Sequence, residues 1–450
     1  MSQLEEISQK LLSFAKEQAV VDADVLAIRN TSDAFNVRHG NIETVEREDA
    51  QGIGLRAFVQ QKGGLAFASA SSSDFSDNGL RALAKQVVDM AQVSAPDSDA
   101  MPPAGAPHPE ALTQHPLSAD IWQREQAITA AIQCEEAALN ASNSIQNSDG
   151  ASAAYGLSHQ CYASADGFVG SHSQSYASLS VSVIAQQGQD MQRDYDYSRA
   201  VTGKQLDNAA NIGRLAAQRT SRRLGAKSTK SGTMTVMFEP RVAVSLLGHL
   251  SAAVNARSIM QKTSFLNDAI NQDLFPKWVT IHDLPDHPLA WNFNPFDGEG
   301  CATQEATLID QGTLCFYPSN RYVAKRMGIP HTAHAQRGLT GDIGIGLNNL
   351  LWQPGQQSQQ ELISDISHGV LITELMGSGV NGVTGDYSRG AAGFMIENGV
   401  ITHPLHEMTI AGNLTDMFKN IRAVGSDLRW FGSRGVASVV IDGMTVAGQS

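Results

Sequence analysis

Cysteine is scarce in this chain of 450 residues, and its spacing excludes two kinds of architecture. The four cysteines are Cys134, Cys161, Cys301 and Cys315, and no two of them form a Cys-x-x-Cys pair. A disulfide framework needs many closely spaced cysteines, and a zinc ribbon needs paired ones. We therefore expect neither, and we expect a reducing, cytoplasmic location.

Long apolar runs and an excess of positive charge are also missing. No stretch approaches the roughly 18 consecutive apolar residues of a transmembrane helix, and the start, MSQLEE, lacks the basic-then-apolar layout of a signal peptide. Lysine and arginine number 32 against 45 aspartates and glutamates, a formal net charge of −13. An acidic surface repels nucleic-acid phosphates and anionic lipids. The sequence thus predicts no membrane partner and no nucleic-acid partner.

The residues that are present are typical of a globular protein, because 42% are hydrophobic and only 17% are charged. Apolar residues recur at helical spacing over residues 3–19, 76–93 and 208–224, and Pro240 suits the first turn of another helix. Period-two stretches and glycine-containing turns between them predict antiparallel hairpins. We predict an α+β fold, with an N-terminal α/β half of antiparallel sheet and helices and a β-rich C-terminal half.

Two breaks in this pattern predict the domain organisation. Prolines cluster in residues 96–117, and proline lacks an amide donor and restricts the residue before it, so this segment is a predicted linker. A basic stretch near residues 222–230 marks the second boundary. The predicted units are an N-terminal α/β domain, a central α/β domain that begins with a helix near Ser118, and a C-terminal β-rich domain. Their bounds are 1–95, 118–228 and 229–450.

Several short patterns resemble known functional motifs. GSGVNG at 377–382 matches the spacing of a dinucleotide-binding loop, but the β-branched and glycine-rich residues after it do not favour the helix that such a site needs. GDYSRG at 385–390 has the wrong spacing for a nucleophile elbow around Ser388. Pairs of histidines supply at most two of the three or four ligands of zinc, so we expect structural histidines. The pairs are 282/287, 331/334 and 403/406.

Longer motifs place the chain in a family. It resembles the TldD/PmbA family along essentially its whole length, and within that family the PmbA (TldE) branch. The motifs that carry the resemblance are RDY at 193–195, LGHL at 247–250, KTSFL at 262–266, TELMG at 373–377, GDYSRGAAGF at 385–394, IENG at 396–399, TIAGNL at 409–414 and VGSD at 424–427.

The resemblance implies a cytosolic subunit of a two-chain metalloprotease that cuts unfolded peptides with little sequence preference. In the family this activity is linked to maturation of a peptide antibiotic and to removal of an antitoxin. The divalent metal ion, zinc by expectation, belongs to the TldD subunit, which carries His-Glu-x-x-x-His on a helix and a downstream cysteine. Two such histidines reach one metal, and the glutamate activates its bound water.

That catalytic motif is absent from this sequence, although the chain has 13 histidines. Gly248, His249 and Ala253 stand where the family motif has its first histidine, its glutamate and its last histidine. The resemblance therefore implies a chain with no catalytic residues and no metal cofactor of its own, which is inactive without its partner.

We predict that the chain completes the peptide channel of a TldD–PmbA peptidase, with a TldD-like subunit and an unfolded peptide as partners. The candidates for facing the partner or the peptide are Glu374, Gly377, Gly379, Asp386, Ser388 and Arg389. The simplest structural role for Asp386 and Arg389, three residues apart, is to pair with each other. Two alternatives stay open. One is a metallopeptidase with a relocated metal site at His403, His406 and Glu407, and the other is a non-enzymatic homodimer that binds peptides or regulates another protein.

Overall fold

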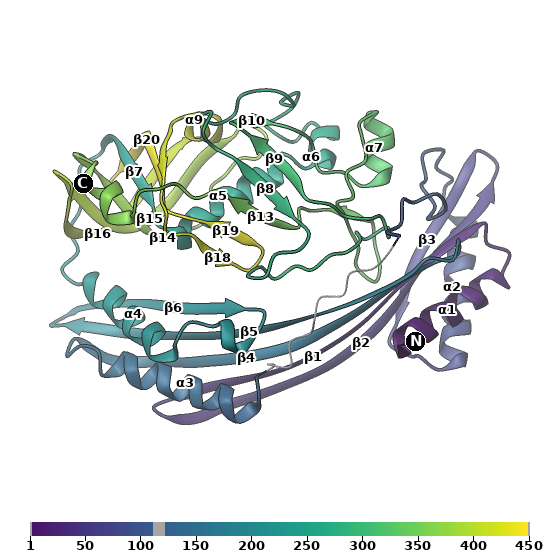
Figure 1. Cartoon of the computed structure of the whole chain (residues 1–450), viewed down its shortest axis with the longest axis horizontal. Helices are drawn as coiled ribbons and strands as arrows, with labels where there is room; N and C mark the ends of the chain where they lie inside the picture. Colours follow the sequence, from purple (N-terminus) through teal and green to yellow (C-terminus); the bar gives the residue numbers. More distant parts are fainter. Residues whose placement is uncertain (1, 111–121, 449–450) are drawn as a thin grey trace.

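The computed structural model describes residues 2–110 and 122–448. A long, strongly curved sheet forms the N-terminal half, and a β-rich C-terminal half sits against its inner face (Figure 1). The predicted α+β class is confirmed. None of the helices in the described residues is both long and apolar enough to cross a membrane.

The N-terminal sheet is six-stranded, in the order β3-β2-β1-β4-β5-β6. Its strands are β1 (Asp22–Arg38), β2 (Asn41–Gln61), β3 (Gly64–Ser72), β4 (Ile145–Ser164), β5 (Val169–Gln187) and β6 (Asp190–Ala200). Because β1 pairs directly with β4, the predicted first and central domains share one sheet. The division at residues 96–117 stays a prediction, and its second part, with the helix start near Ser118, lies outside the described residues.

Four helices cover the outer face of this sheet, α1 and α2 at one end and α3 and α4 at the other (Figure 1). They are α1 (Gln3–Lys16), α2 (Asp77–Val93), α3 (Arg124–Leu139) and α4 (Ala209–Arg222). Ser2 and Glu5 form the capping box that starts α1, and Ser76 caps α2. Alternate residues of β1 point at the helices, since Val25 packs in the α1/α2 core and Phe35 in the α3/α4 core.

The C-terminal half contains two six-stranded sheets. The first runs β10 (Thr313–Leu314), β9 (Ala306–Asp310), β8 (Ile281–Leu284), β13 (Asn349–Trp352), β19 (Arg434–Val436) and β18 (Arg429–Phe431). The second runs β16 (Val400–Asn413), β15 (Asp386–Glu397), β14 (His368–Met376), β7 (Gly232–Phe238), β20 (Val439–Ala447) and β17 (Ile421–Val424), and β16 also pairs with β20. A separate two-stranded sheet consists of β11 (Ala335–Gln336) and β12 (Gly344–Ile345).

Helix α5 (Pro240–Ala253) contacts strands of both C-terminal sheets, and Pro240 occupies its first turn as predicted. Leu246, Leu247 and Leu250 bury its apolar face in the largest core of the protein. The shorter helices are η1 (Gly203–Gln205), α6 (Ala256–Met260), α7 (Arg321–Met327), α8 (Gln359–Ser364) and α9 (Leu414–Lys419).

A buried ion cluster joins the two halves at one end of the long sheet. Asp24 on β1 is fully buried and accepts hydrogen bonds from Arg56 on β2, at 3.2 and 2.5 Å. Arg337, from the C-terminal half, approaches the same carboxylate to 2.6 Å. Burial alone would raise the pKa of Asp24, but the two guanidinium groups lower it. Loss of either cation would leave buried charge uncompensated, so the cluster fixes the relative position of the halves.

A second ion cluster joins the halves near the other end of the sheet. Arg241, in the first turn of α5, donates to Asp194 on β6 at 2.8 Å and to Glu239 at 3.0 Å. Arg219 of α4 donates to the same Glu239 at 2.6 Å. Burial alone would raise the pKa of Asp194, but Arg241 lowers it. The beginning of α5 is therefore tied directly to the N-terminal sheet.

Beside the Asp24 cluster, strand β2 packs closely against Leu339 of the C-terminal half. Two positions of β2, Gly52 and Gly54, therefore have no room for a side chain. A Cβ at Gly54 would overlap the backbone carbonyl of Leu339, and a Cβ at Gly52 would overlap its side chain. We predict that Gly54→Ala lowers the free energy of unfolding by about 1–3 kcal/mol, because backbone must move to admit the methyl group. The matched control is Gly232→Ala on β7, where a Cβ meets no atom within 4 Å. Equal denaturant midpoints for the two variants would contradict this packing.

Candidate functional site beneath the β14–β15 loop

The second half of α5 carries the residues at which we expect the family's catalytic motif. Gly248 is half-buried and opens onto free space, since a Cβ there would have no atom within 4 Å. His249 is also half-buried and faces β15. Ala253 is buried in the core, and its carbonyl accepts a hydrogen bond from the Ser264 hydroxyl at 2.6 Å. One face of this helix turn is thus open and the other is packed.

His249, Tyr387 and Arg389 form a polar group between α5 and β15. The His249 and Tyr387 rings meet edge to face, with centroids 5.9 Å apart. Among the described residues, His249 Nε2 and Arg389 Nε are buried without a hydrogen-bond partner, and the buried Tyr387 Oη has none but the Arg389 side chain. Burial, with the Arg389 charge adding to it, lowers the pKa of His249. Burial also raises the pKa of Tyr387 to about 12, against the effect of Arg389. At neutral pH the group is therefore a neutral imidazole, a neutral phenol and one cation.

These residues do not fit a catalytic metal ion. His249 offers one nitrogen ligand, whereas Gly248 and Ala253 offer none. Within the described residues, His249 belongs to no cluster of histidine, cysteine or carboxylate ligand atoms close enough to share an ion. The Arg389 guanidinium would also repel a divalent cation. The group beside His249 therefore offers a positive side chain and not a set of metal ligands.

The loop between β14 and β15 brings most of the predicted partner-facing residues together. Residues 377–385, all of them described, contain no helix, which agrees with the rejection of a dinucleotide site. The backbone amide of Ser388 donates to the Gly379 carbonyl at 2.7 Å, and Arg389 donates to the Gly377 carbonyl at 2.7 Å. Gly377 and Gly385 have φ values of +69° and +79°, where glycine is favoured. The loop thus folds back over the start of β15.

The expected pairing of Asp386 with Arg389 is wrong. Asp386 accepts hydrogen bonds from Thr384 at 2.6 Å and from Asn413 at 3.3 Å, which lower its pKa. An odd spacing along β15 places the two side chains on opposite faces of the strand. Glu374, at the end of β14, pairs instead with Arg223 at 2.6 Å. Arg389 therefore has a carbonyl oxygen and no carboxylate as its partner among the described residues.

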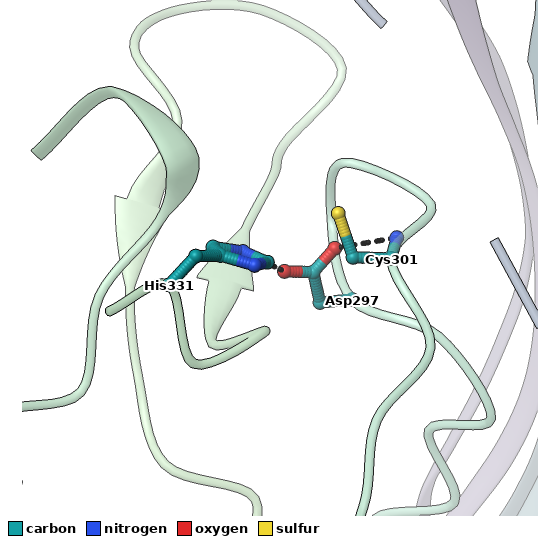
Figure 2. A group of neighbouring side chains, drawn as sticks. All are labelled: Asp297, Cys301 and His331. Carbon is teal, nitrogen blue, oxygen red and sulfur yellow. Dashed lines mark hydrogen bonds and ion pairs between the residues drawn. The ribbon is translucent and has the colours of Figure 1, made fainter. Parts of the chain in front are cut away.

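A different group has the composition of a metal site. Asp297, Cys301 and His331 place ligand atoms within 4.8 Å of one another (Figure 2). The Asp297 carboxylate already accepts the backbone amides of Glu299, Cys301 and Ala335 at 2.9–3.0 Å, and His331 Nε2 lies 3.9 Å away. Burial, with the nearby carboxylates adding to it, raises the pKa of the Cys301 thiol, so it stays protonated. These contacts describe a carboxylate that clamps a turn.

The histidine pairs noted in the sequence have structural partners in several cases. His334 is buried and lies 2.8 Å from the buried Asp283 carboxylate. His282 lies 3.2 Å from the Thr307 hydroxyl. His403, His406 and Glu407 lie along β16, on the far side of β15 from β14, and do not form a ligand cluster in the described residues. No sequence pattern pointed to Tyr387 or to the Asp297 turn, because their partners come from distant segments.

A cavity of about 310 Å³ lies between the middle of the long sheet and the C-terminal half. Its lining is mostly uncharged and polar, with Asn30, Ser158, Gln174, Tyr176 and Trp291 among the lining residues. Gln174 Oε1 and Trp291 Nε1 are buried without hydrogen-bond partners in the protein. The cavity therefore offers a free acceptor and a free donor beside an aromatic surface.

Models of three domains of one metallopeptidase family match almost all of the chain. The PmbA/TldA metallopeptidase domain 1 matches residues 23–91, the central domain matches 120–224, and the C-terminal domain matches 231–448.

Individual relatives match over nearly full length. The chain is 33% identical to the metalloprotease PmbA of Escherichia coli O157:H7, over 95% of this chain and 92% of the relative. It is 31% identical to a metalloprotease PmbA homolog of Haemophilus influenzae, over 98% and 96% of the two chains. The crystal structure of a proposed modulator of DNA gyrase from Bacteroides thetaiotaomicron superposes with a TM-score of 0.89 at 26% identity, covering 100% of both chains.

The charge of Arg389 beside His249 predicts a change in titration. Removing it by Arg389→Gln should raise the pKa of His249, while burial keeps the pKa below the ordinary value of about 6.5. A lowered folded-state pKa means that the unfolded chain binds more protons as pH falls through about 6.5, so His249 costs stability on acidification. Arg389→Gln should reduce that loss.

Histidine-detected NMR measures this shift, with His249→Gln to assign the resonance. Arg422→Gln is the matched control, because Arg422 is exposed and pairs with Asp442 at 3.5 Å. An unchanged His249 titration in Arg389→Gln would contradict the electrostatic contact.

If Asp297 is a turn clamp, Asp297→Ala should be strongly destabilising and Cys301→Ala should not. Loss of the carboxylate leaves three buried amides without an acceptor, at about 1–3 kcal/mol each. Thermal melts of the two variants measure the difference. In parallel, Cd²⁺ is added to the parent chain and to Cys301→Ala. A stoichiometric thiolate-to-metal absorption that only the parent chain gives would contradict the clamp and identify a metal site.

Proposed function

The chain belongs to the TldD/PmbA metallopeptidase family, and on that premise we propose that it is the non-hydrolytic subunit of a two-chain peptidase. One observation carries this proposal. The helix that aligns with the family's catalytic helix has Gly248 and Ala253 in place of ligands, and Arg389 supplies a positive charge beside it. Without a metal or a general base at this position, hydrolysis has to come from another subunit.

The partner in this proposal is a TldD-like subunit that carries the zinc ion, and the substrate is an unfolded peptide. The candidates Glu374, Gly377, Gly379, Asp386, Ser388 and Arg389 face that partner or the peptide. Their gathering around one loop supports this role, and Asp386 and Ser388 are exposed there. The four cysteines are free thiols, which supports a cytosolic location.

Two features support contact with a peptide backbone. The first is the mostly uncharged cavity between the halves, where Gln174 Oε1 and Trp291 Nε1 lack hydrogen-bond partners among the described residues. The second is residues 41–51 of β2, which pair with β1, whereas β3 pairs with β2 only from Ile53 onwards. An extended peptide that adds to such an edge is held through its main chain, which gives little sequence preference. The charged residues of this edge also protect it against unspecific pairing.

A second candidate function is a metallopeptidase with its own metal, and the Asp297–Cys301–His331 group is the observation that favours it. It would need a fourth ligand position open to substrate and a thiolate in place of the protonated thiol. A homodimeric peptide-binding protein is the third. Both are outcomes of the experiment that follows.

The proposal is tested by purifying this chain and a TldD-like subunit separately and then mixing them. We predict that the chain alone, with added Zn²⁺, does not cleave a fluorophore-labelled unfolded polypeptide, that the mixture does, and that light scattering detects a complex of the two. Gly232→Ala on β7 is the control variant and should leave cleavage unchanged, because its methyl group meets no atom within 4 Å and it lies outside the candidate site. Cleavage by the chain alone, or a stable homodimer that does not associate with the partner, would contradict the proposal.

A further inference from the structure

Three unsatisfied hydrogen-bond donors meet between α5 and β15. Tyr387 is only 1% exposed, and among the described residues its hydroxyl has no acceptor for its proton, since the Arg389 side chain beside it can only donate. The same holds for Arg389 Nε and His249 Nε2. Tyrosine and arginine donate through these atoms, and histidine does so when its proton is on Nε2. Buried polar groups without partners are costly and uncommon in folded proteins, so this group requires an acceptor from outside.

The group also carries an unbalanced charge. Most arginines of the ion clusters, such as Arg241 and Arg56, have carboxylate partners at 2.5–3.0 Å. Among the described residues Arg389 has the Gly377 carbonyl and the Tyr387 hydroxyl as partners and no carboxylate, and the neighbouring His249 and Tyr387 are neutral at pH 7. A half-buried cation without a counter-ion attracts an anion more strongly than a solvated one does.

The three donor atoms are buried, but two of the side chains that carry them are partly exposed. His249 and Arg389 are half-buried, whereas Tyr387 lies behind them. Free space adjoins both: a Cβ on Gly248, next to His249, or on Gly377, whose carbonyl holds Arg389, would meet no atom within 4 Å. A small group on a flexible chain can therefore approach the exposed parts of His249 and Arg389 from this space.

We propose that His249, Tyr387 and Arg389 form a binding site for a carboxylate of the peptide, its C-terminal carboxylate in the first instance. This rests on the proposed function, since it takes the peptide as the ligand. A carboxylate supplies two oxygens and a negative charge, so it satisfies the unpaired donors and balances Arg389 together. A neutral carbonyl would satisfy one or two of the donors but would leave the Arg389 charge unbalanced. A metal ion would find hydrogen-bond donors there and no ligand set.

The test uses the full chain without its partner and two probes that differ in one group. The probes are N-acetyl-trialanine with a free carboxylate and the same peptide as its C-terminal amide, and binding is followed by NMR of the His249 resonance. We expect the acid to bind at least about tenfold more tightly than the amide, as one charge-assisted hydrogen bond predicts. Arg389→Gln should remove that preference, and Tyr387→Phe should reduce it by a few-fold with the ring packing kept.

Arg422→Gln, an exposed arginine on β17, is the control and should leave the preference unchanged. Thermal melts check that each variant is folded. If Arg389→Gln does not fold, Tyr387→Phe provides the test. Equal binding of acid and amide would overturn the proposal. Tighter binding of inorganic phosphate than of the acid would overturn it in favour of a phosphate ligand.

A further outcome concerns the partner subunit. If Arg389→Gln weakens association with the TldD-like subunit and leaves the acid's binding intact, the cation contacts a carboxylate of the partner and the proposal is wrong. Because these probes bind the chain alone, their result is separate from association and cleavage in the mixture. If the unsubstituted chain binds the acid and the amide equally while the mixture still cleaves the polypeptide, this site is refuted and the two-subunit function still stands.

Discussion

The buried Asp24 carboxylate imposes the constraint on which the rest of the structure depends. Its charge is balanced by Arg56 from the same sheet and by Arg337 from the C-terminal half, so neither half can leave without exposing a buried ion. The Arg241–Asp194–Glu239 cluster ties the two halves together in the same way at the beginning of α5. The two clusters hold α5 and β15 in place over the inner face of the sheet, and they leave a polar cavity between the halves.

The charge around the second half of α5 does not suit a hydrolytic metal ion. A hydrolytic metal needs converging anionic or neutral ligands, but the corresponding turn of α5 faces a cation, a phenol and one neutral imidazole. Side chains that could ligate an ion do meet at Asp297, Cys301 and His331 (Figure 2), where three backbone amides already occupy the carboxylate. The fold has thus kept the scaffold of the family while the local charge at the α5 site favours anions over cations.

Local pattern predicted much of this fold, because helix caps and amphipathic spacing act within a few residues. The capping box at Ser2 and the helix after Pro240 are examples. Contacts between distant residues could not be predicted in this way, since Asp24 and Arg337 are separated by most of the chain. The sequence suggested that Asp386 and Arg389 could pair because residues three apart are neighbours on a helix. On strand β15 the same spacing places them on opposite faces. The role of Tyr387 depends on its contact with His249, which comes from another element.

The central claim is that the hydrolytic metal of the assembly is held by the partner and not by this chain. Its most direct test is a metal analysis of the purified two-subunit complex, followed by separation of the subunits under mild conditions and analysis of each. The account predicts stoichiometric zinc in the TldD-like subunit and none retained by this chain. Stoichiometric zinc that stays with this chain, and that Cys301→Ala or His249→Gln removes, would contradict it.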